Sequence, residues 1–360
     1  MSPSALYIHL PFCKQKCNYC DFVSYAGKEE LINDYVEALV KEIEGQRHQG
    51  TKGVKTVFFG GGTPTLLDPN HFDKIISTLI CHLSLDIGHS EISVEANPGT
   101  ADRAKLKELR SLGINRLSIG VQSFHDRHLK TLGRIHDSKT AEVFYDDARA
   151  AGFDNINLDL IFALPDQYLN EWKKDIQQAI AMRPDHLSIY NLQIEEGTPF
   201  HQQQTTNNLQ LPTEEIELAM YEYAIDCLWL TGYQHYEISN FSKPGKECRH
   251  NINYWQMGNW LGFGAGAHTH LNGKRWANPN CLETYLKGTK TEPDKIIGDQ
   301  GETLFMGLRL LEGLPAEKFH GFEKEVAELI NDGLLKEDQG NYKLTKQGLY
   351  LANLVFEKFV

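Results

Sequence analysis

The sequence predicts an α/β protein: a partial (β/α)6 barrel, an irregular strand-containing extension and a small C-terminal winged-helix-like domain. Six short apolar segments of strand length recur in the first part of the chain, and a helical pattern of apolar residues follows each of them. Such a series gives a parallel sheet with helical crossovers, and six units instead of eight favour an incomplete barrel. Glycine-rich, cysteine-containing and polar segments follow the predicted strands, at the edge where βα proteins place their sites.

The first predicted domain spans residues 1–232 and contains all six βα units. Its predicted strands cover residues 5–9, 54–59, 91–95, 116–122, 155–162 and 186–192. Its predicted helices cover residues 31–46, 69–83, 100–112, 138–151, 168–182 and 213–231. Pro69 suits the first helical position of the second helix, and Asp68 before it is the expected N-cap.

Two further domains are predicted after the barrel. The segment 233–279 is aromatic, glycine-rich and poorly periodic, so an irregular extension with strands is expected to pack beside the barrel, within a domain of residues 233–295. Residues 296–360 form the winged-helix-like domain. Its predicted elements are helices 302–311 and 323–331, a hairpin over 336–344 that turns at 339–341, and a last helix to residue 359 capped by Thr345.

Composition excludes several classes of function. The 360-residue chain carries a net charge of −12, which is the wrong sign for a nucleic-acid partner. No apolar run reaches the roughly 18 residues of a membrane span, and the N-terminal residues lack the features of a secretory signal. Four of the seven cysteines are scattered singly, which fits a reducing cytoplasm.

The other three cysteines are clustered with the spacing C-x3-C-x2-C, at Cys13, Cys17 and Cys20. Three thiolates on so short a loop can converge on one metal centre, whereas an odd number cannot all form disulfides. A structural zinc ion would need a fourth ligand, for which His9 is available. Zinc sites usually combine two separated C-x2-C pairs, and no second pair exists here, so an iron–sulfur cluster with one open iron is favoured.

With Tyr19 before the last cysteine, this loop resembles that of the radical S-adenosylmethionine superfamily. The resemblance implies a radical-SAM barrel in which the three cysteines bind three irons of a [4Fe–4S] cluster and S-adenosylmethionine chelates the fourth. The run Gly60, Gly61, Gly62, Thr63 after the second strand is by itself equally compatible with a tight βα turn. In the superfamily it holds the amino group of the cofactor through backbone carbonyls.

Further positions resemble the oxygen-independent coproporphyrinogen III oxidase branch of this superfamily. The positions that the resemblance assigns to S-adenosylmethionine, beside the glycine run, are Tyr7, Phe22, Glu95, Gln122, Arg134 and Asp159. Carboxylates can bind the ammonium and ribose hydroxyls of the cofactor, and an arginine can pair with its carboxylate. Taken singly, each polar residue is better explained as a solvated loop residue or a helix cap, but five of them at the ends of consecutive strands favour a shared site.

Two departures separate the oxidases of this branch from the HemW-type heme chaperones. The oxidases carry a further cysteine two positions after the third, where this chain has Phe22, and an N-terminal extension, where only six residues precede Tyr7. Both departures favour the chaperones. That resemblance implies no catalytic residues and argues against coproporphyrinogen oxidase activity, while it leaves open whether S-adenosylmethionine is cleaved.

The segment from Cys248 to Trp255 resembles the H-N-x-x-Y-W pattern that those chaperones associate with heme. His250 is the expected donor to the heme iron, with Cys248 as a rival, and Tyr254 and Trp255 are expected to flank the ring. The residues alone favour a structural histidine in an aromatic cluster, and only the resemblance reverses that preference.

The sequence therefore predicts a cytoplasmic heme chaperone that holds a [4Fe–4S] cluster, S-adenosylmethionine and heme. Its expected partners are heme-acceptor proteins, among which membrane-associated respiratory enzymes are candidates. A homodimer and a peripheral position at the inner membrane stay open. One rival is an enzyme that oxidatively decarboxylates the propionates of coproporphyrinogen III. Another is a zinc-stabilised winged-helix regulator, which the acidic charge and the βα series disfavour.

Overall fold

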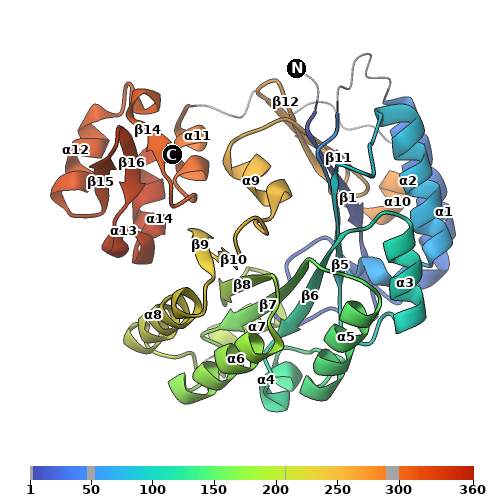
Figure 1. The fold of residues 1–360 in the computed structure, drawn as a ribbon, viewed down its shortest axis with the longest axis horizontal. Coiled ribbons are helices and arrows are strands. Elements are labelled where there is room, and N and C mark those ends of the chain that lie inside the picture. The colour runs from blue at the N-terminus through green and yellow to red at the C-terminus, as the bar shows by residue number, and fades with distance from the viewer. Residues whose placement is uncertain (1–2, 47–52, 207, 289–299) are drawn as a thin grey trace.

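Six parallel strands form the centre of one curved sheet, as the sequence pattern predicts (Figure 1). The computed structural model of the chain describes residues 3–46, 53–206, 208–288 and 300–360. The six strands are β1 (Ala5–Leu10), β4 (Thr56–Gly61), β5 (Glu91–Ala96), β6 (Arg116–Gln122), β7 (Ile156–Phe162) and β8 (His186–Asn191). They are hydrogen-bonded to one another in this order and in parallel, so their carboxyl ends meet at one edge.

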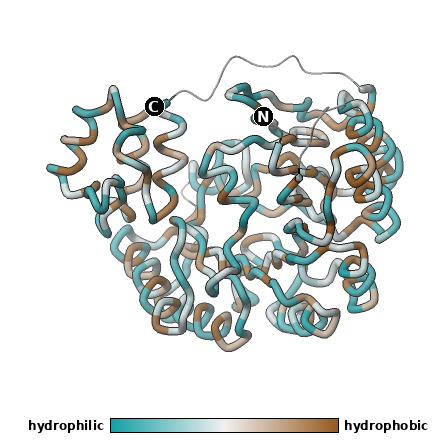
Figure 2. The backbone as a smooth tube through the Cα atoms, turned by 45° about the horizontal axis from the view of Figure 1, so that its top comes forward, coloured by the Kyte–Doolittle hydropathy of each residue, from teal (hydrophilic) through white to brown (hydrophobic). Residues whose placement is uncertain are grey.

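Helices cover the outer face of this sheet, and they alternate hydrophobic and hydrophilic residues (Figure 2). They are α1 (Ile32–Gly45), α2 (Pro69–Leu83), α3 (Arg103–Ser111), α5 (Ser138–Ala150), α6 (Leu169–Met182) and α8 (Glu214–Leu230). The predicted start of α2 is confirmed, because Asp68 has extended dihedrals and its backbone N–H donates to Nδ1 of His71 at 3.1 Å. The apolar stripes of the helices and the sheet form one core.

The structure differs from the predicted helices in number and in length. The structure adds two short helices, α4 (Asp126–Thr131) and α7 (Pro199–Thr205), which are too short to show apolar periodicity. The helix predicted at 302–311 is α11 (Gln300–Gly307). It ends early because the chain then joins the extension, where the backbone N–H of Leu311 donates to the carbonyl of Tyr236 at 3.1 Å.

The extension continues the sheet at both of its edges and does not merely pack beside the barrel. At one edge, β9 (Gln234–Glu237) and β10 (Asn240–Ser242) follow β8 in antiparallel orientation. At the other edge, β11 (Trp260–Phe263) lies parallel to β1 and is followed by β12 (His268–Leu271) and β13 (Lys274–Ala277). Between them the chain forms α9 (Arg249–Trp255), and α10 (Leu282–Leu286) packs against α1.

The C-terminal domain is a small helical unit with a three-stranded sheet and a hydrophobic core of its own. After α11, its elements are β14 (Leu314–Pro315), α12 (Glu323–Asn331), β15 (Leu335–Asp338), β16 (Asn341–Leu344), α13 (Lys346–Tyr350) and α14 (Ala352–Phe356), with short 3-10 turns at Ala316–Phe319 and Glu357–Phe359. Thr345 caps α13 as predicted, since its side chain accepts from the N–H of Gly348. The single predicted last helix is broken at Leu351, which lets Val355 and Phe359 reach the core.

The predicted domain boundary at residue 296 lies outside the described residues. In Figure 1 the C-terminal domain occupies the opposite end of the long axis from α1 and α2, and α9 lies between it and the barrel strands. Across the described ranges, every helix is too short or too polar to cross a lipid bilayer.

A buried tyrosine fastens the first strand to the extension. The hydroxyl of Tyr35 on α1 donates to the backbone carbonyl of His9 at 2.8 Å and accepts from the N–H of Ala265 at 2.9 Å. Its side chain is fully buried, so no solvent can replace either bond.

We therefore predict that Tyr35→Phe lowers the free energy of unfolding by about 1–3 kcal/mol, since it leaves two buried backbone groups without a partner. Denaturant titration followed by circular dichroism measures this change. Tyr168→Phe is the matched control, because Tyr168 is 66% exposed; it is expected to change the free energy by less than about 0.5 kcal/mol. Equal stabilities of the two variants would contradict this role of Tyr35.

Candidate functional site

The carboxyl ends of the parallel strands surround a cavity of about 600 Å³. All three clustered cysteines line it. So do most of the positions that the sequence assigns to S-adenosylmethionine, namely Tyr7, Phe22, Gly61, Gly62, Glu95, Gln122, Arg134 and Asp159. A hollow of about 670 Å³ between α2, α3 and α5 is more open and contains none of the predicted site residues. The fold thus brings the predicted residues together in one place.

The cysteine loop leaves β1 and passes over one side of this cavity. Cys13 is buried, whereas Cys17 and Cys20 are half-buried. The Thr63 hydroxyl donates to Sγ of Cys13 at 3.7 Å, and the Arg134 guanidinium donates to Sγ of Cys17 at 3.5 Å. Donors aimed at sulfur suit thiolates in an iron–sulfur cluster, where hydrogen bonds to sulfur are usual.

Zinc and an iron–sulfur cluster place different demands on the three cysteines. Zinc would need every ligand atom within about 2.3 Å of one point. Among the described residues, no three or more His, Cys, Asp or Glu side chains are grouped tightly enough to hold a single ion. In a cubane cluster each cysteine binds a different iron, so the sulfurs can stand farther apart. His9, the fourth ligand that zinc would need, has both ring nitrogens hydrogen-bonded, to Tyr7 and to Val23, so the three cysteines fit a cluster with one open iron better than they fit zinc.

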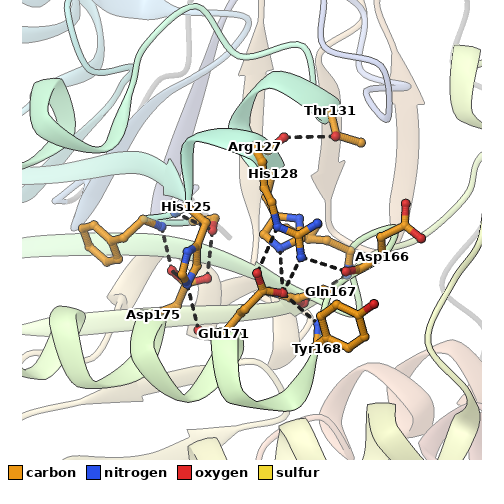
Figure 3. Close-up of polar contacts among 12 residues, drawn as sticks. His125, Arg127, His128, Thr131, Asp166, Gln167, Tyr168, Glu171 and Asp175 are labelled. Atoms are coloured by element: carbon orange, nitrogen blue, oxygen red, sulfur yellow. Dashed lines mark hydrogen bonds and ion pairs between the residues drawn. The ribbon is translucent and has the colours of Figure 1, made fainter.

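Helix α4 holds the far end of the cysteine loop. The backbone N–H of Asn18 donates to the Leu132 carbonyl at 3.0 Å, and its side-chain amide donates to the Thr131 carbonyl at 2.8 Å. Helix α4 is fixed in turn by Glu171 of α6, which accepts from Arg127 at 2.9 Å (Figure 3). Although burial opposes ionisation, the hydrogen bond from Arg127 lowers the pKa of Glu171 to about 2, so this ion pair persists at neutral pH.

A second carboxylate of α6 fixes the backbone that follows β6. Asp175 is fully buried; its oxygens accept from the Ser123 hydroxyl at 2.8 Å and from the Phe124 N–H at 2.7 Å (Figure 3). These bonds stabilise the preceding Gln122, whose φ of +69° lies in the left-handed region. Gln122 is buried, and its Oε1 has no hydrogen-bond partner within the described residues. A ligand in the cavity could satisfy that oxygen.

Gly61 and Gly62 are required where β4 passes the cysteine loop. Gly61 has a φ of +112°, and a Cβ on it would lie 2.5 Å from the ring of His9. A Cβ on Gly62 would lie 2.6 Å from the carbonyl of Phe12. Close packing therefore explains these two glycines without any ligand. That the backbone of residues 60–63 holds the cofactor amino group stays a prediction.

Two carboxylates lie deep in the cavity and destabilise each other's charge. Burial, and then the nearby charge of Asp159, raises the pKa of Glu95 to about 8, although the Gly61 N–H donates to Glu95 at 3.0 Å. Burial also raises the pKa of Asp159, against hydrogen bonds from Asn157 and Ser118. A cationic ligand would favour the ionised form of both carboxylates.

Arg134 joins three parts of the site. Besides Cys17, its guanidinium contacts the side-chain oxygen of Asn97 after β5 and donates to the carbonyl of Gly120 in β6 at 2.6 Å. S-adenosylmethionine carries an ammonium, a sulfonium and a carboxylate, so a cavity with two buried carboxylates and one arginine fits its charges. An Arg134 substitution is expected to disturb the cysteine loop as well as a bound ligand.

The predicted heme segment contributes to the same cavity from α9. His250 is buried, with Nδ1 2.9 Å from the Thr56 hydroxyl, Nε2 2.8 Å from the Tyr254 hydroxyl, and its ring stacked on Phe58. Burial, assisted by Arg116, lowers the pKa of His250 to about 3, so the ring is neutral. Both ring nitrogens are therefore in use. Binding iron would require His250 to give up one of these bonds.

The other residues of this segment lie differently. Cys248 is buried, and burial raises the pKa of its thiol to about 12 in spite of the nearby Arg116. Trp255 does not line this cavity, and its ring lies under the Arg309 guanidinium, which is 4.3 Å from the ring centre. That His250, Tyr254 and Trp255 bind heme stays a prediction.

Sequence reasoning missed a polar layer at the floor of the cavity. Its members are Arg116, Ser118, Asn157 and Ser188, all buried. Asn157 connects this layer, because its amide donates to the hydroxyls of Ser118 at 2.7 Å and Ser188 at 3.0 Å. The sequence does contain a pattern that could have predicted this layer. Polar residues stand at alternate positions of two predicted strands, 116 and 118 in one and 157 and 159 in the other, and alternate residues of a strand point to the same face.

Known proteins share the fold of this chain and a large part of its sequence. The profile of the radical SAM superfamily matches residues 7–179, and that of the HemN C-terminal domain matches residues 301–351. Coproporphyrinogen III oxidase (HemN) from Escherichia coli superposes with a TM-score of 0.83 over 99% of this chain and 90% of its own, at 23% identity. At that identity the likeness establishes the fold alone. The profile match and the superposition together define a radical S-adenosylmethionine fold.

Relatives that match this chain over nearly its full length identify the family to which it belongs. The heme chaperone HemW of Lactococcus lactis is 36% identical over 99% of this chain and 97% of its own length. Those of Bacillus subtilis and Escherichia coli are each 36% identical over at least 98% of both chains. The chain belongs to the HemW family.

We predict that Glu95→Gln weakens binding of S-adenosylmethionine by about 10- to 100-fold, because a charged hydrogen-bond acceptor is replaced by a neutral one. The change in the electron paramagnetic resonance signal of the reduced protein on titration with S-adenosylmethionine measures the affinity. Absorption of the reconstituted cluster should be unchanged, since Glu95 contacts none of the cysteines. Glu108→Gln, on the exposed face of α3, serves as the control. Equal affinities of the two variants would contradict a role for Glu95.

Proposed function

We propose that this chain is a heme chaperone that holds a [4Fe–4S] cluster and S-adenosylmethionine, binds heme and transfers it to acceptor proteins. The observation that carries the proposal is the convergence of Cys13, Cys17 and Cys20 with buried carboxylates and Arg134 in one cavity, in a chain whose full-length relatives are named heme chaperones. The alternative is an oxygen-independent coproporphyrinogen III oxidase.

Within the proposed site each residue has a physical task. A [4Fe–4S] cluster on the three cysteines would supply redox chemistry and one iron open to an outside ligand. Arg134 and Thr63 donate to the cysteine sulfurs and would stabilise them as thiolates. Glu95 and Asp159 would bind the cationic and hydroxyl groups of S-adenosylmethionine. Gln122, held by its left-handed backbone, would offer its free Oε1.

The position of Phe22 supports the chaperone over the oxidase. In the oxidase branch a further cysteine is expected there, but the Phe22 side chain is 64% exposed at the cavity mouth and supplies no thiol. The polar residues of the cavity do not discriminate, because both subfamilies are expected to keep them.

The proposed partners are proteins that accept heme, with membrane-associated respiratory enzymes among the candidates. All seven cysteines are free thiols, which supports a reducing cytoplasm as the place of transfer. The net charge of −12 supports a partner other than nucleic acid.

The test uses the full chain with its cluster reconstituted under anaerobic conditions. We predict that titration with hemin produces a saturable Soret band and that an apo-heme protein added afterwards gains the heme. Incubation with coproporphyrinogen III, S-adenosylmethionine and a reductant should yield no decarboxylated product. Formation of that product, or no saturable binding of heme, would overturn the proposal.

The cluster and the heme are expected to occupy separate sites. We predict that Cys17→Ala abolishes the cluster absorption but keeps heme affinity within about twofold of the wild type, since Cys17 lies on the cysteine loop and not on α9 or the extension. Cys81→Ala is the control, because Cys81 is an exposed thiol on α2. Loss of heme binding by a folded Cys17→Ala protein would contradict separate sites.

A further inference from the structure

A second cavity, of about 520 Å³, lies next to the first and opens between the barrel and the C-terminal domain. Its walls come from α9 (Trp255), the edge strands of the extension (Trp260, His268 and Arg275) and α11 (Met306). The volume falls in the range of cofactor sites in proteins. Nothing in the sequence pattern predicted this cavity, because its walls come from three separate parts of the chain.

The two cavities share one wall. Six residues line both of them: Tyr7, Asp21, Phe22, Gly61, Glu95 and Tyr254. A ligand in the second cavity would therefore lie beside the first without occupying it. His250, by contrast, lines the first cavity and not the second. Heme bound to His250 would compete for space with S-adenosylmethionine.

His268 is the available imidazole at the second cavity. It is the first residue of β12 and is exposed, and within the described ranges no hydrogen bond reaches its ring nitrogens. Burial of part of the ring, and then the charge of Arg275, lowers the pKa of His268, so the ring is neutral and able to donate a lone pair. The other histidine there, His9, has both nitrogens engaged, at 3.0 Å from the Tyr7 hydroxyl and 2.8 Å from the Val23 carbonyl.

The remaining walls suit a flat apolar ring with acidic substituents. Trp255, Trp260, Phe22 and Met306 offer apolar surface, and aromatic rings and a thioether adapt well to a planar ligand. Two buried N–H donors here lack a hydrogen-bond partner in the described structure, Nε of Arg275 and Nε1 of Trp255. The Arg275 guanidinium is already ion-paired with Glu302, and Asp21 and Glu95 also line the cavity, so Nε of Arg275 and Nε1 of Trp255 are the two donors left to bind a carboxylate group of the ligand.

We propose that heme binds in this second cavity and that His268, not His250, donates the axial ligand to its iron, with Arg275 at the propionates. This assignment rests on the proposed function and names the site at which the chaperone would bind its heme. It explains how one chain can hold S-adenosylmethionine and heme at once, because each has its own cavity. The exposed position of His268 on β12, the second strand from the sheet edge, also permits release, since an acceptor can reach the iron ligand without unfolding the core.

The test compares variants of the full chain with reconstituted cluster, each titrated with hemin. His268→Ala should shift the Soret band and weaken heme affinity by about tenfold or more, and added imidazole should restore the band. His268→Cys should give a third spectrum, because a thiolate replaces the imidazole on iron. Cluster absorption and the response to S-adenosylmethionine should stay unchanged in both variants. His320→Ala, at an exposed histidine of the C-terminal domain, is the control.

Two results would separate this inference from the proposed function. If His268→Ala keeps the wild-type spectrum and affinity while His250→Ala changes them, the assignment of His268 is overturned and the heme function stands. If the wild type itself shows no saturable binding of heme, the proposed function fails and the inference falls with it.

Discussion

The guanidinium of Arg134 is the interaction on which the first cavity depends. It contacts Cys17 of the cysteine loop, Asn97 after β5 and the Gly120 carbonyl in β6, so one side chain sets the distance between three chain segments. The cation also offsets the negative charge that three thiolates and two carboxylates would bring to one place. Arg134 therefore both balances the charge of the first cavity and holds its chain segments in place.

Helix α6 stands behind this arrangement without touching the cavity. Glu171 fixes α4, from whose end Arg134 follows, and Asp175 fixes the backbone after Gln122 (Figure 3). Two carboxylates on one helix thus determine where an arginine and a glutamine point. Such indirect support explains how a site built from strand ends and loops keeps a defined shape.

The sequence predicted the repeating part of the fold and the residues of the first cavity, and the reasons are local. The βα alternation determined the order of six strands, and the carboxyl-end rule brought Cys13, Glu95 and Asp159 together. What it could not predict depends on partners distant along the chain. The edge strands β9–β13 pair with β8 and β1, and His268 reaches a cavity that exists only once α9 and α11 are in place. The hydrogen bonds that engage His250 come likewise from Thr56 on another strand.

The pairing of β1 with β11 has a consequence for biosynthesis. Strand β1 leaves the ribosome long before the extension does, yet its outer edge is covered only by residues near Trp260; Ser4 bonds to Asn259, 255 positions later. Until then an apolar strand keeps a row of open backbone donors and acceptors, which invites pairing with other chains. Cluster insertion before that point would act on a sheet with an open edge. We expect the nascent chain to depend on protection by folding factors until the extension has been made.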